Sequence, residues 1–323
     1  MSDLSNLEGR AVLVTGAAGC IGAWTVKLLT EIGAVPVVFD LTDNRQRLEL
    51  IMNGAESVTW ELGDITDFER LQAVAEKHNI EAIIHLAALQ VPFCKTDPVG
   101  STKINVIGST HILELARLRG ITRLSYASSI AAQAMDNNEW LATLYGAHKV
   151  CTEQMSAVYW QDWKVPSVGI RPAIIYGPGR DQGMSSAPTV AMLAAAVGDS
   201  YQIPFSGNIS YVHVEDAALR FVAAVSKSSV GAYVFDLDGT PADIGQVISL
   251  IESEQTNATI SYTGDPMPFP AESDNGLLNQ FLDIPGCRPM AQGVADTIAV
   301  FGQAKERGVD LKQLLDVTIR RSA

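Results

Sequence analysis

The stretch Thr15-Gly16-Ala17-Ala18-Gly19-Cys20-Ile21-Gly22 decides the fold of this chain. It follows an apolar run at residues 11–15 and opens an amphipathic segment at residues 21–31, so a strand, a turn and a helix are expected in that order. Gly16 permits a tight turn, Gly19 lets the backbone approach a pyrophosphate, and Gly22 lets the helix pack closely on the strand. The helix N-terminus favours the anion. We therefore expect a dinucleotide to contact Gly16, Gly19, Cys20, Ile21 and Gly22.

Asp40 ends the second apolar run, at residues 35–40, and predicts which dinucleotide is bound. At this place in a βαβ unit, a carboxylate hydrogen-bonds the hydroxyls of the adenosine ribose. Because its charge repels a 2′-phosphate, the sequence favours NAD over NADP as the cofactor. Arg45 and Arg47 follow closely in the sequence and leave use of both cofactors open.

Short apolar runs alternate with helix-like segments through the first half of the chain, which is typical of a parallel sheet built from βαβ units. Strands are expected at residues 11–15, 35–40, 57–61, 82–86, 123–127 and 167–171, and helices at 21–31, 68–78, 102–119 and 145–163. The prediction is an α/β fold with a doubly wound, Rossmann-like sheet. After residue 171 the alternation breaks among glycines and prolines. We expect residues 1–175 plus about 211–240 to form the NAD-binding domain, and about 176–210 and 241–323 to form a smaller substrate-binding portion.

Two further segments follow expected strands and point to the same crevice. Asp64 and Ile65 come after the third strand, where they would meet the adenine edge. Leu86, Ala87 and Ala88 come after the fourth strand and are expected under the cofactor, because dinucleotides bind at the carboxyl ends of the strands. Asp64 is equally well explained as a polar turn residue ahead of the next helix.

Tyr145 and Lys149 stand four positions apart and hence on one face of a helix. The pKa of a tyrosine hydroxyl is about 10. For the phenol to act as a base near neutrality, this pKa must fall by roughly 3 units, which corresponds to about 4 kcal/mol. The lysine cation and the positive charge of nicotinamide are expected to lower it. Ser129 ends the fifth strand, so its hydroxyl faces the same crevice. We expect Ser129, Tyr145 and Lys149 to be the catalytic group, with Tyr145 and Lys149 also contacting the cofactor.

Composition and charge narrow the choice of partners. A formal net charge of −13 repels phosphate backbones and anionic lipids, so we expect a small-molecule substrate, no nucleic acid and no membrane. Cys20, Cys94, Cys151 and Cys287 lack CxxC or Cys/His spacing, which argues against a metal site and against a disulfide framework. There is no signal-peptide pattern and no long apolar stretch, so the cytoplasm is the expected location.

Eight motifs, read in order, resemble a known family: TGAAGCIG, GDITD, HLAA, NVIGS, YASS, YGAHK, RPAIIYGPG and YVHVEDAA. They are similar to those of the extended short-chain dehydrogenase/reductase family, including its NAD-dependent epimerase/dehydratases, from about residue 10 to about residue 240. The resemblance implies that Tyr145 is the general acid/base and that Lys149 binds the nicotinamide ribose while lowering the pKa of the tyrosine. It further implies that Ser129 bonds the substrate, with Ser128 as the second option.

Other polar residues near these motifs have supporting roles. The resemblance implies that Asn105 supports the active-site helix. His85 has apolar neighbours, which favours a buried, hydrogen-bonded histidine over a functional one. His148 lies between Tyr145 and Lys149 but off their common face, so we expect it at the surface.

The chain departs from the family's nucleotide-sugar epimerases where those proteins contact substrate. Gln133-Ala134 replaces their usual Tyr-Gly pair, Ala173-Ile174 stands in place of an asparagine, and Asn208-Ile209-Ser210 in place of an arginine. A charge-assisted contact to a diphosphate, worth roughly 1.5 to 3 kcal/mol, is therefore missing. We expect a smaller substrate: a free sugar, a sugar acid or a related hydroxy compound. Arg171 either clamps a carboxylate of that substrate or supports a strand end.

Three functions compete. The leading prediction is a dehydrogenase that transfers a hydride between C–OH and NAD; the second is a sugar or nucleotide-sugar epimerase, which returns the hydride. Ile130-Ala131 stands where family dehydratases carry an Asp-Glu pair, which disfavours dehydration. A non-catalytic NAD-sensing regulator is the third, although such proteins often lose the tyrosine or lysine that this chain retains. The resemblance also implies a homodimer paired through the helices at 102–119 and 145–163.

Overall fold

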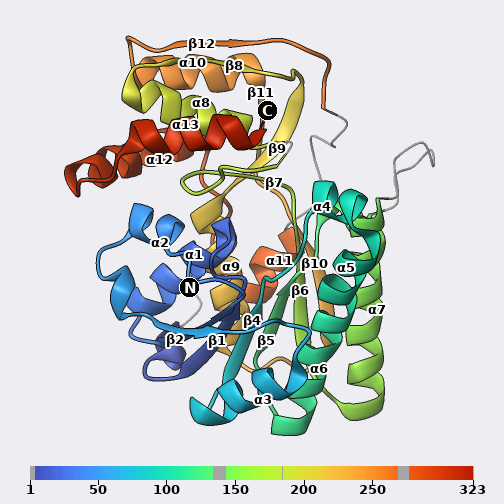
Figure 1. The fold of residues 1–323 in the computed structure, drawn as a ribbon. Helices are drawn as coiled ribbons and strands as arrows, with labels where there is room; N and C mark the ends of the chain where they lie inside the picture. The colour runs from blue at the N-terminus through green and yellow to red at the C-terminus, as the bar shows by residue number, and fades with distance from the viewer. Residues whose placement is uncertain (1–3, 134–142, 184, 268–275, 323) are drawn as a thin grey trace.

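A seven-stranded parallel sheet forms the centre of the protein. The computed structural model describes residues 4–133, 143–183, 185–267 and 276–322 (Figure 1). The strands of this sheet are β1 (Ala11–Thr15), β2 (Val35–Asp40), β3 (Thr59–Leu62), β4 (Ala82–His85), β5 (Leu124–Ala127), β6 (Ser167–Pro172) and β10 (Ala232–Leu237). Their order is β10-β6-β5-β4-β1-β2-β3, and every neighbouring pair is parallel. The prediction of a doubly wound α/β fold is confirmed.

Helices cover both faces of the sheet, because successive strand residues point to opposite sides. Val12 and Val14 belong to the core formed with α1 (Cys20–Glu31) and α9 (Val214–Ser226). Leu13 belongs to the core formed with α3 (Phe68–Lys77) and α6 (Gly108–Arg119). α7 (Leu144–Trp163) lies beside α6 on this second face (Figure 1).

Polar residues and glycines set the helix ends. Asp67 begins α3, where its side chain accepts a hydrogen bond from the backbone N–H of Arg70 at 3.0 Å. Thr143 begins α7 in the same way, by accepting from the N–H of Gly146 at 3.0 Å. These side chains satisfy backbone donors that have no partner within the helix. The cap at Thr143 fixes the first turn of α7, and Tyr145 lies in that turn.

Strand order places a crevice at the carboxyl ends of β1 and β4. β1 pairs with β2 on one side and β4 on the other, so the chain reverses its direction of winding between these two strands. Connections from the carboxyl ends of neighbouring strands then turn to opposite faces and leave an opening, which is where open α/β sheets bind ligands.

A second unit sits above this edge of the sheet in Figure 1. It contains a three-stranded sheet in the order β11-β9-β7 and a pair formed by β8 and β12. Its elements are β7 (Ile174–Tyr176), α8 (Ala187–Val197), β8 (Ser200–Ile203), β9 (Asn208–His213), β11 (Thr240–Asp243), α10 (Ile244–Glu254), β12 (Thr259–Tyr262), α12 (Met290–Glu306) and α13 (Leu311–Ser322). α11 (Gly276–Leu282) instead packs on β10, with the Phe281 ring 4.9 Å from that of Phe235.

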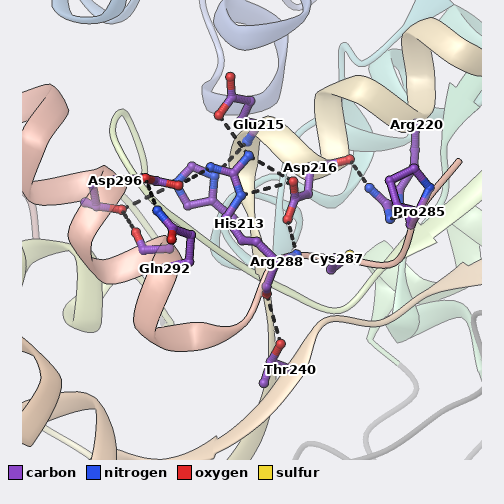
Figure 2. A network of polar contacts seen from close by, with 12 residues as sticks. His213, Glu215, Asp216, Arg220, Thr240, Pro285, Cys287, Arg288, Gln292 and Asp296 are labelled. Carbon is purple, nitrogen blue, oxygen red and sulfur yellow. Dashed lines mark hydrogen bonds and ion pairs between the residues drawn. The ribbon is translucent and has the colours of Figure 1, made fainter. Parts of the chain in front are cut away.

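Arg288 ties the second unit to the sheet domain (Figure 2). Its guanidinium donates to Glu215 at 2.9 Å, to Asp216 at 2.9 Å and to Asp296 at 2.6 Å. The two former carboxylates lie in the first turn of α9, whereas Asp296 belongs to α12. The backbone carbonyl of Arg288 also accepts from Thr240 in β11 at 3.0 Å. Through its side chain and its backbone, this one residue therefore joins α9, α12 and β11.

The remaining short elements are η1 (Leu4–Leu7), α2 (Gln46–Ile51), η2 (Ala55–Ser57), α4 (Val91–Thr96), α5 (Pro98–Thr102), η3 (Lys103–Ile107) and η4 (Ile130–Ala132). Among the described residues, no helix combines the length and apolar character needed to cross a membrane. The same residues contain no group of three or more His, Cys, Asp or Glu side chains arranged to hold a metal ion. The four cysteines carry free thiols.

Candidate active site

A cleft of about 680 Å³ opens at the carboxyl ends of the central strands. Residues from both halves of the sheet line it, and so do residues of the loop between β7 and α8. Every residue that the sequence assigns to cofactor binding or catalysis lies on its wall: Gly16, Gly19, Cys20, Ile21, Gly22, Asp40, Asp64, Ile65, Leu86, Ala87, Ala88, Ser129, Tyr145 and Lys149. The fold thus brings residues from six separate segments to one place.

The turn after β1 has room for backbone only. Gly16 adopts a left-handed conformation with φ of 73°, and a Cβ there would lie 2.6 Å from the backbone N of Ala87. A Cβ on Gly22 would lie 2.4 Å from the carbonyl oxygen of Gly16. Gly19 stands at the N-terminus of α1 and offers no capping side chain. The backbone N–H groups that start α1 therefore remain available to an anion such as a pyrophosphate.

Asp40 shapes this turn from the end of β2. Its carboxylate accepts hydrogen bonds from the backbone N–H of Ala18 at 3.0 Å and of Leu41 at 2.8 Å. Burial raises the pKa of Asp40, against the effect of these hydrogen bonds. The carboxylate oxygens have further lone pairs for ribose hydroxyls. Asp64 also lines the cleft, and it accepts hydrogen bonds from the N–H and the hydroxyl of Thr66 at 2.8 Å. Its position is therefore compatible both with a contact to the adenine edge and with a role as a polar turn residue.

Arg45 and Arg47, the two arginines that left binding of NADP open, both donate hydrogen bonds to other groups of the protein. Arg45 donates to Asp43 at 2.6 Å and stacks 4.8 Å from the Trp60 ring. Arg47 donates to Asp181 at 2.5 Å and to the carbonyl oxygens of Ala18 and Gly179 at 2.5 and 2.9 Å. A 2′-phosphate beside Asp40 would have to compete with these partners, so the site fits NAD better than NADP.

Ser129, Tyr145 and Lys149 converge at one wall of the cleft. The Ser129 side chain caps η4 by accepting from the N–H of Ala131 at 3.1 Å, and it hydrogen-bonds Tyr145. The Lys149 ammonium lies 5.5 Å from the centre of the Tyr145 ring and donates to the Ala127 carbonyl at 2.6 Å. Two hydroxyls and a cation therefore face the same volume, as the sequence predicts.

Burial dominates the electrostatics of this group. It lowers the pKa of Lys149 to about 8, because the low-polarity surroundings disfavour its charged form. Burial also raises the pKa of Tyr145, whereas the Ser129 hydrogen bond and the positive charge of Arg180 act in the opposite direction. The sequence pointed to Lys149 as the cation that lowers the pKa of Tyr145, whereas in the structure the cation that lowers it is Arg180.

Ser128 and Arg171 both bind the buried carboxylate of Glu153 next to the site. Ser128 hydrogen-bonds the buried carboxylate of Glu153, which also accepts from Arg171 through both oxygens, at 2.6 and 2.7 Å. Asp236 accepts from the same arginine at 3.4 Å. These bonds engage the guanidinium of Arg171, which favours the strand-supporting role over a carboxylate clamp. Ser128 faces Glu153, so Ser129 is the serine placed to meet substrate.

Two histidines and an asparagine brace the same region. His85 is buried and hydrogen-bonds Thr15 at 2.7 Å and Ser109 at 3.1 Å, which confirms the structural interpretation. The expectation that His148 lies at the surface is wrong. It is buried and bonds Thr102 and Asn105, because the segment before α6 covers this side of α7. Asn105 also bonds the backbone of Leu89, so it joins the β4–α4 connection to α7.

Arg180, which no sequence motif singled out, also lines the cleft. It follows Gly-Pro-Gly in the loop after β7, and its charge acts on Tyr145. A cation within a glycine-rich loop at the crevice was the signal that sequence reasoning had available. Gln133, another residue noted as a departure, lies just after η4, whereas Ala134 lies outside the described residues.

A doubly wound parallel sheet with a glycine turn at its switch point, and a Ser/Tyr/Lys group beside it, defines an enzyme of the extended short-chain dehydrogenase/reductase class. The sequence profile described as "NAD dependent epimerase/dehydratase family" matches residues 12–235. The chain belongs to the NAD dependent epimerase/dehydratase family. The prediction of NAD as cofactor is thereby confirmed for the family to which the chain belongs.

Individual relatives agree with this assignment. UDP-glucose 4-epimerase of Mus musculus is 30% identical over 283 residues, which cover 75% of this chain and 81% of the relative. UDP-glucose 4-epimerase of Rhizobium leguminosarum bv. trifolii is 36% identical over 177 residues, about half of each chain (51% and 52%).

Solved structures share the fold. UDP-glucose 4-epimerase with UDP-glucose from Thermotoga maritima matches with a TM-score of 0.77 at 22% identity, over 92% of this chain and 100% of that chain. L-threonine dehydrogenase from Clostridium difficile matches with a TM-score of 0.77 at 20% identity, over 92% of this chain and 98% of that chain. Proteins of two different reactions thus share this architecture, so fold alone does not select the reaction.

Proposed function

We propose that this protein is an NAD-dependent dehydrogenase that oxidises a C–OH group of a small sugar, a sugar acid or a related hydroxy compound, and catalyses the reverse reduction. The observation that carries this proposal is the meeting of Ser129, Tyr145 and Lys149 in the cleft that also contains the glycine turn and Asp40. Such a site can bind a dinucleotide and a hydroxyl next to each other.

Each of the three residues has its own role in the proposed reaction. Bound NAD supplies a hydride acceptor for the carbinol carbon. Ser129 and Tyr145 hydrogen-bond the substrate oxygen, and Tyr145 takes its proton as the carbonyl forms. Lys149 is held by the Ala127 carbonyl, and with a pKa of about 8 it carries positive charge at neutral pH, which stabilises the phenolate of Tyr145.

The wall of the cleft supports a small substrate. Ala173 and Ile174 line it with apolar side chains, at the place where the related nucleotide-sugar epimerases are expected to carry an asparagine. Asn208 and Ser210 belong to β9, and neither lines the cleft. A diphosphate would therefore lack these two expected contacts, whereas a free sugar or sugar acid needs neither.

Epimerisation of a sugar or nucleotide sugar is the second candidate. It is favoured by the sequence similarity to UDP-glucose 4-epimerases over three quarters of the chain. The same serine, tyrosine and lysine would begin both reactions, which differ in whether the hydride returns to the substrate.

A screen of absorbance in the reduced-nicotinamide band tests the proposal. The purified protein is incubated with NAD and with free sugars, aldonates, uronates and nucleotide sugars in turn. We expect net NADH to accumulate with a small hydroxy compound. An isomerised product without NADH would instead establish the epimerase. NAD binding without turnover over the whole panel would indicate a regulator.

We also propose a cytoplasmic homodimer. Its free thiols are compatible with a reducing compartment. The helices assigned to pairing expose several large apolar side chains: Ile107, Leu118, Leu144, Val150, Val158 and Trp163. Burying apolar surface of this kind between two copies is favourable.

A further inference from the structure

Arg180 lines the cleft without a carboxylate partner among the described residues. Its Nε is buried and has no hydrogen-bond partner there. Within the part of the chain that the structure describes, its Nη2 donates to the Ser185 hydroxyl alone, at 3.3 Å. The adjacent Asp181 is engaged by Arg47 at 2.5 Å. The guanidinium of Arg180 thus retains unused donors on the wall of the active site.

Two other half-buried arginines have carboxylate partners, whereas the half-buried Arg123 and the buried Arg220 donate to carbonyl oxygens. Arg171 is bound by Glu153 through two oxygens, and Arg288 is bound by Asp216 and two further carboxylates. A guanidinium removed from water without such a partner is costly, and a bound anion relieves that cost. None of these four arginines lines the cleft, whereas Arg180 presents its unused donors there, so its partner is expected to arrive with the substrate.

The loop that carries Arg180 is anchored on both sides. The indole N–H of Trp24 donates to the Pro178 carbonyl at 2.9 Å, and Arg47 donates to the Gly179 carbonyl at 2.9 Å. The Thr189 hydroxyl accepts from the N–H of Gly177 at 3.0 Å. The backbone next to Arg180 is therefore fixed before any ligand binds, which reduces the entropy cost of recognition.

Arg180 lies close enough to Tyr145 for its charge to act on the phenol, so an anion on Arg180 lies near the hydroxyl that reacts. We infer that Arg180 binds the carboxylate of a small hydroxy acid whose reacting C–OH is held by Ser129 and Tyr145. This inference rests on the proposed function and narrows its substrate class.

A carboxylate suits this position better than the diphosphate of a nucleotide sugar. Carboxylate and guanidinium are planar and form two parallel hydrogen bonds. The acid group of an aldonate or other short hydroxy acid is only a few bonds from its hydroxyls. In a nucleotide sugar, by contrast, the sugar ring separates the diphosphate from the carbon oxidised in 4-epimerisation.

Matched acid and neutral ligands test the inference on the full-length, NAD-loaded protein. Aldonates of three to six carbons are compared with the alditols of the same skeleton, by calorimetric binding and by NADH formation. We expect the wild type to prefer one acid. Arg180→Met should weaken binding of that acid and raise its KM by ~100-fold while leaving NAD affinity unchanged, because it removes charge-assisted hydrogen bonds. Arg180→Lys, which keeps the charge but not the planar fork, should show a smaller loss.

Arg123→Met serves as the matched control, because Arg123 is half-buried and donates to the Val225 carbonyl away from the cleft. It should leave acid binding unchanged. Equal binding of acid and alditol, or equal losses for both in Arg180→Met, would overturn the inference while leaving the dehydrogenase intact. Acid binding that depends on Arg180, but without NADH formation, would support the inference and refute the proposed oxidation.

Discussion

The phenol of Tyr145 is subject to opposing influences that a sequence motif does not reveal. Burial raises its pKa, whereas the Ser129 hydroxyl and the charge of Arg180 lower it. Lys149 contacts the ring from one side and is itself held by a backbone carbonyl. Ser129 and Arg180, from two other segments of the chain, thus act on the acidity of a phenol in α7.

Tyr145→Phe tests the role of this phenol directly. Loss of a proton-transfer group should lower kcat by roughly 100-fold or more, with NAD affinity nearly unchanged. Steady-state kinetics and a titration of NAD by protein fluorescence measure the two effects. Tyr159→Phe, on the same helix but bonded to Glu114, should retain full turnover. Unchanged turnover in the first variant would remove Tyr145 from the mechanism.

Local patterns identified the glycine turn and the Tyr/Lys pair, because their spacing alone places them in a turn or on one helix face. Arg180 was missed since its position depends on the loop bonds to Trp24 and Arg47, which join segments far apart in the sequence. His148 was misplaced for a related reason. The helical period shows which side of α7 it occupies, but not that another segment covers that side.

Among the secondary-structure elements, β3 and α3 are joined by a small charge cluster. Glu61 of β3 accepts from Lys77 at 2.6 Å, from His78 at 2.7 Å and from Arg70 at 2.7 Å. Chiefly through the Lys77 hydrogen bond, these partners lower the pKa of Glu61 to about 2 from an ordinary 4.5. Between these pH values the unfolded chain binds more protons than the folded one, so stability is lost as pH falls.

Glu61→Gln should therefore destabilise the protein by about 1 kcal/mol at pH 7, since the cluster is partly open to solvent. The difference in free energy of unfolding between the wild type and this variant should stay constant down to about pH 4.5 and become smaller below that pH. Urea unfolding followed by circular dichroism at stepped pH values measures this. Glu76→Gln, at an exposed position of α3, is the control. A difference in free energy of unfolding that does not change with pH would contradict the lowered pKa of Glu61.

Apolar runs predicted the strands well because most are buried on both faces and contain few polar residues. The helix predicted at residues 102–119 was less accurate. Its first turn is the π-helix η3, which contains Asn105. The side chain of Asn105 satisfies the Leu89 backbone and reaches His148, contacts that the helical period does not encode.

In the molecule as a whole, the exposed apolar face of α6 and α7 is the surface assigned to pairing. Val158→Glu should shift the proposed dimer to monomer, because it would bury a charge between two apolar faces. Light scattering coupled to gel filtration measures the mass. Val35→Glu is the control, since Val35 is 45% exposed, close to the 47% of Val158, but lies at the amino end of β2. A wild-type monomer, or a dimer that tolerates Val158→Glu, would refute this interface.

Arg47 contacts the turn after β1 through Ala18 and the loop of Arg180 through Gly179 and Asp181. An attempt to re-engineer the protein for NADP would need to replace Asp40 and redirect Arg47 toward a phosphate. That redirection would release the loop that positions Arg180. Cofactor preference and substrate choice are thus coupled in this chain, and directed evolution of one property would also change the other.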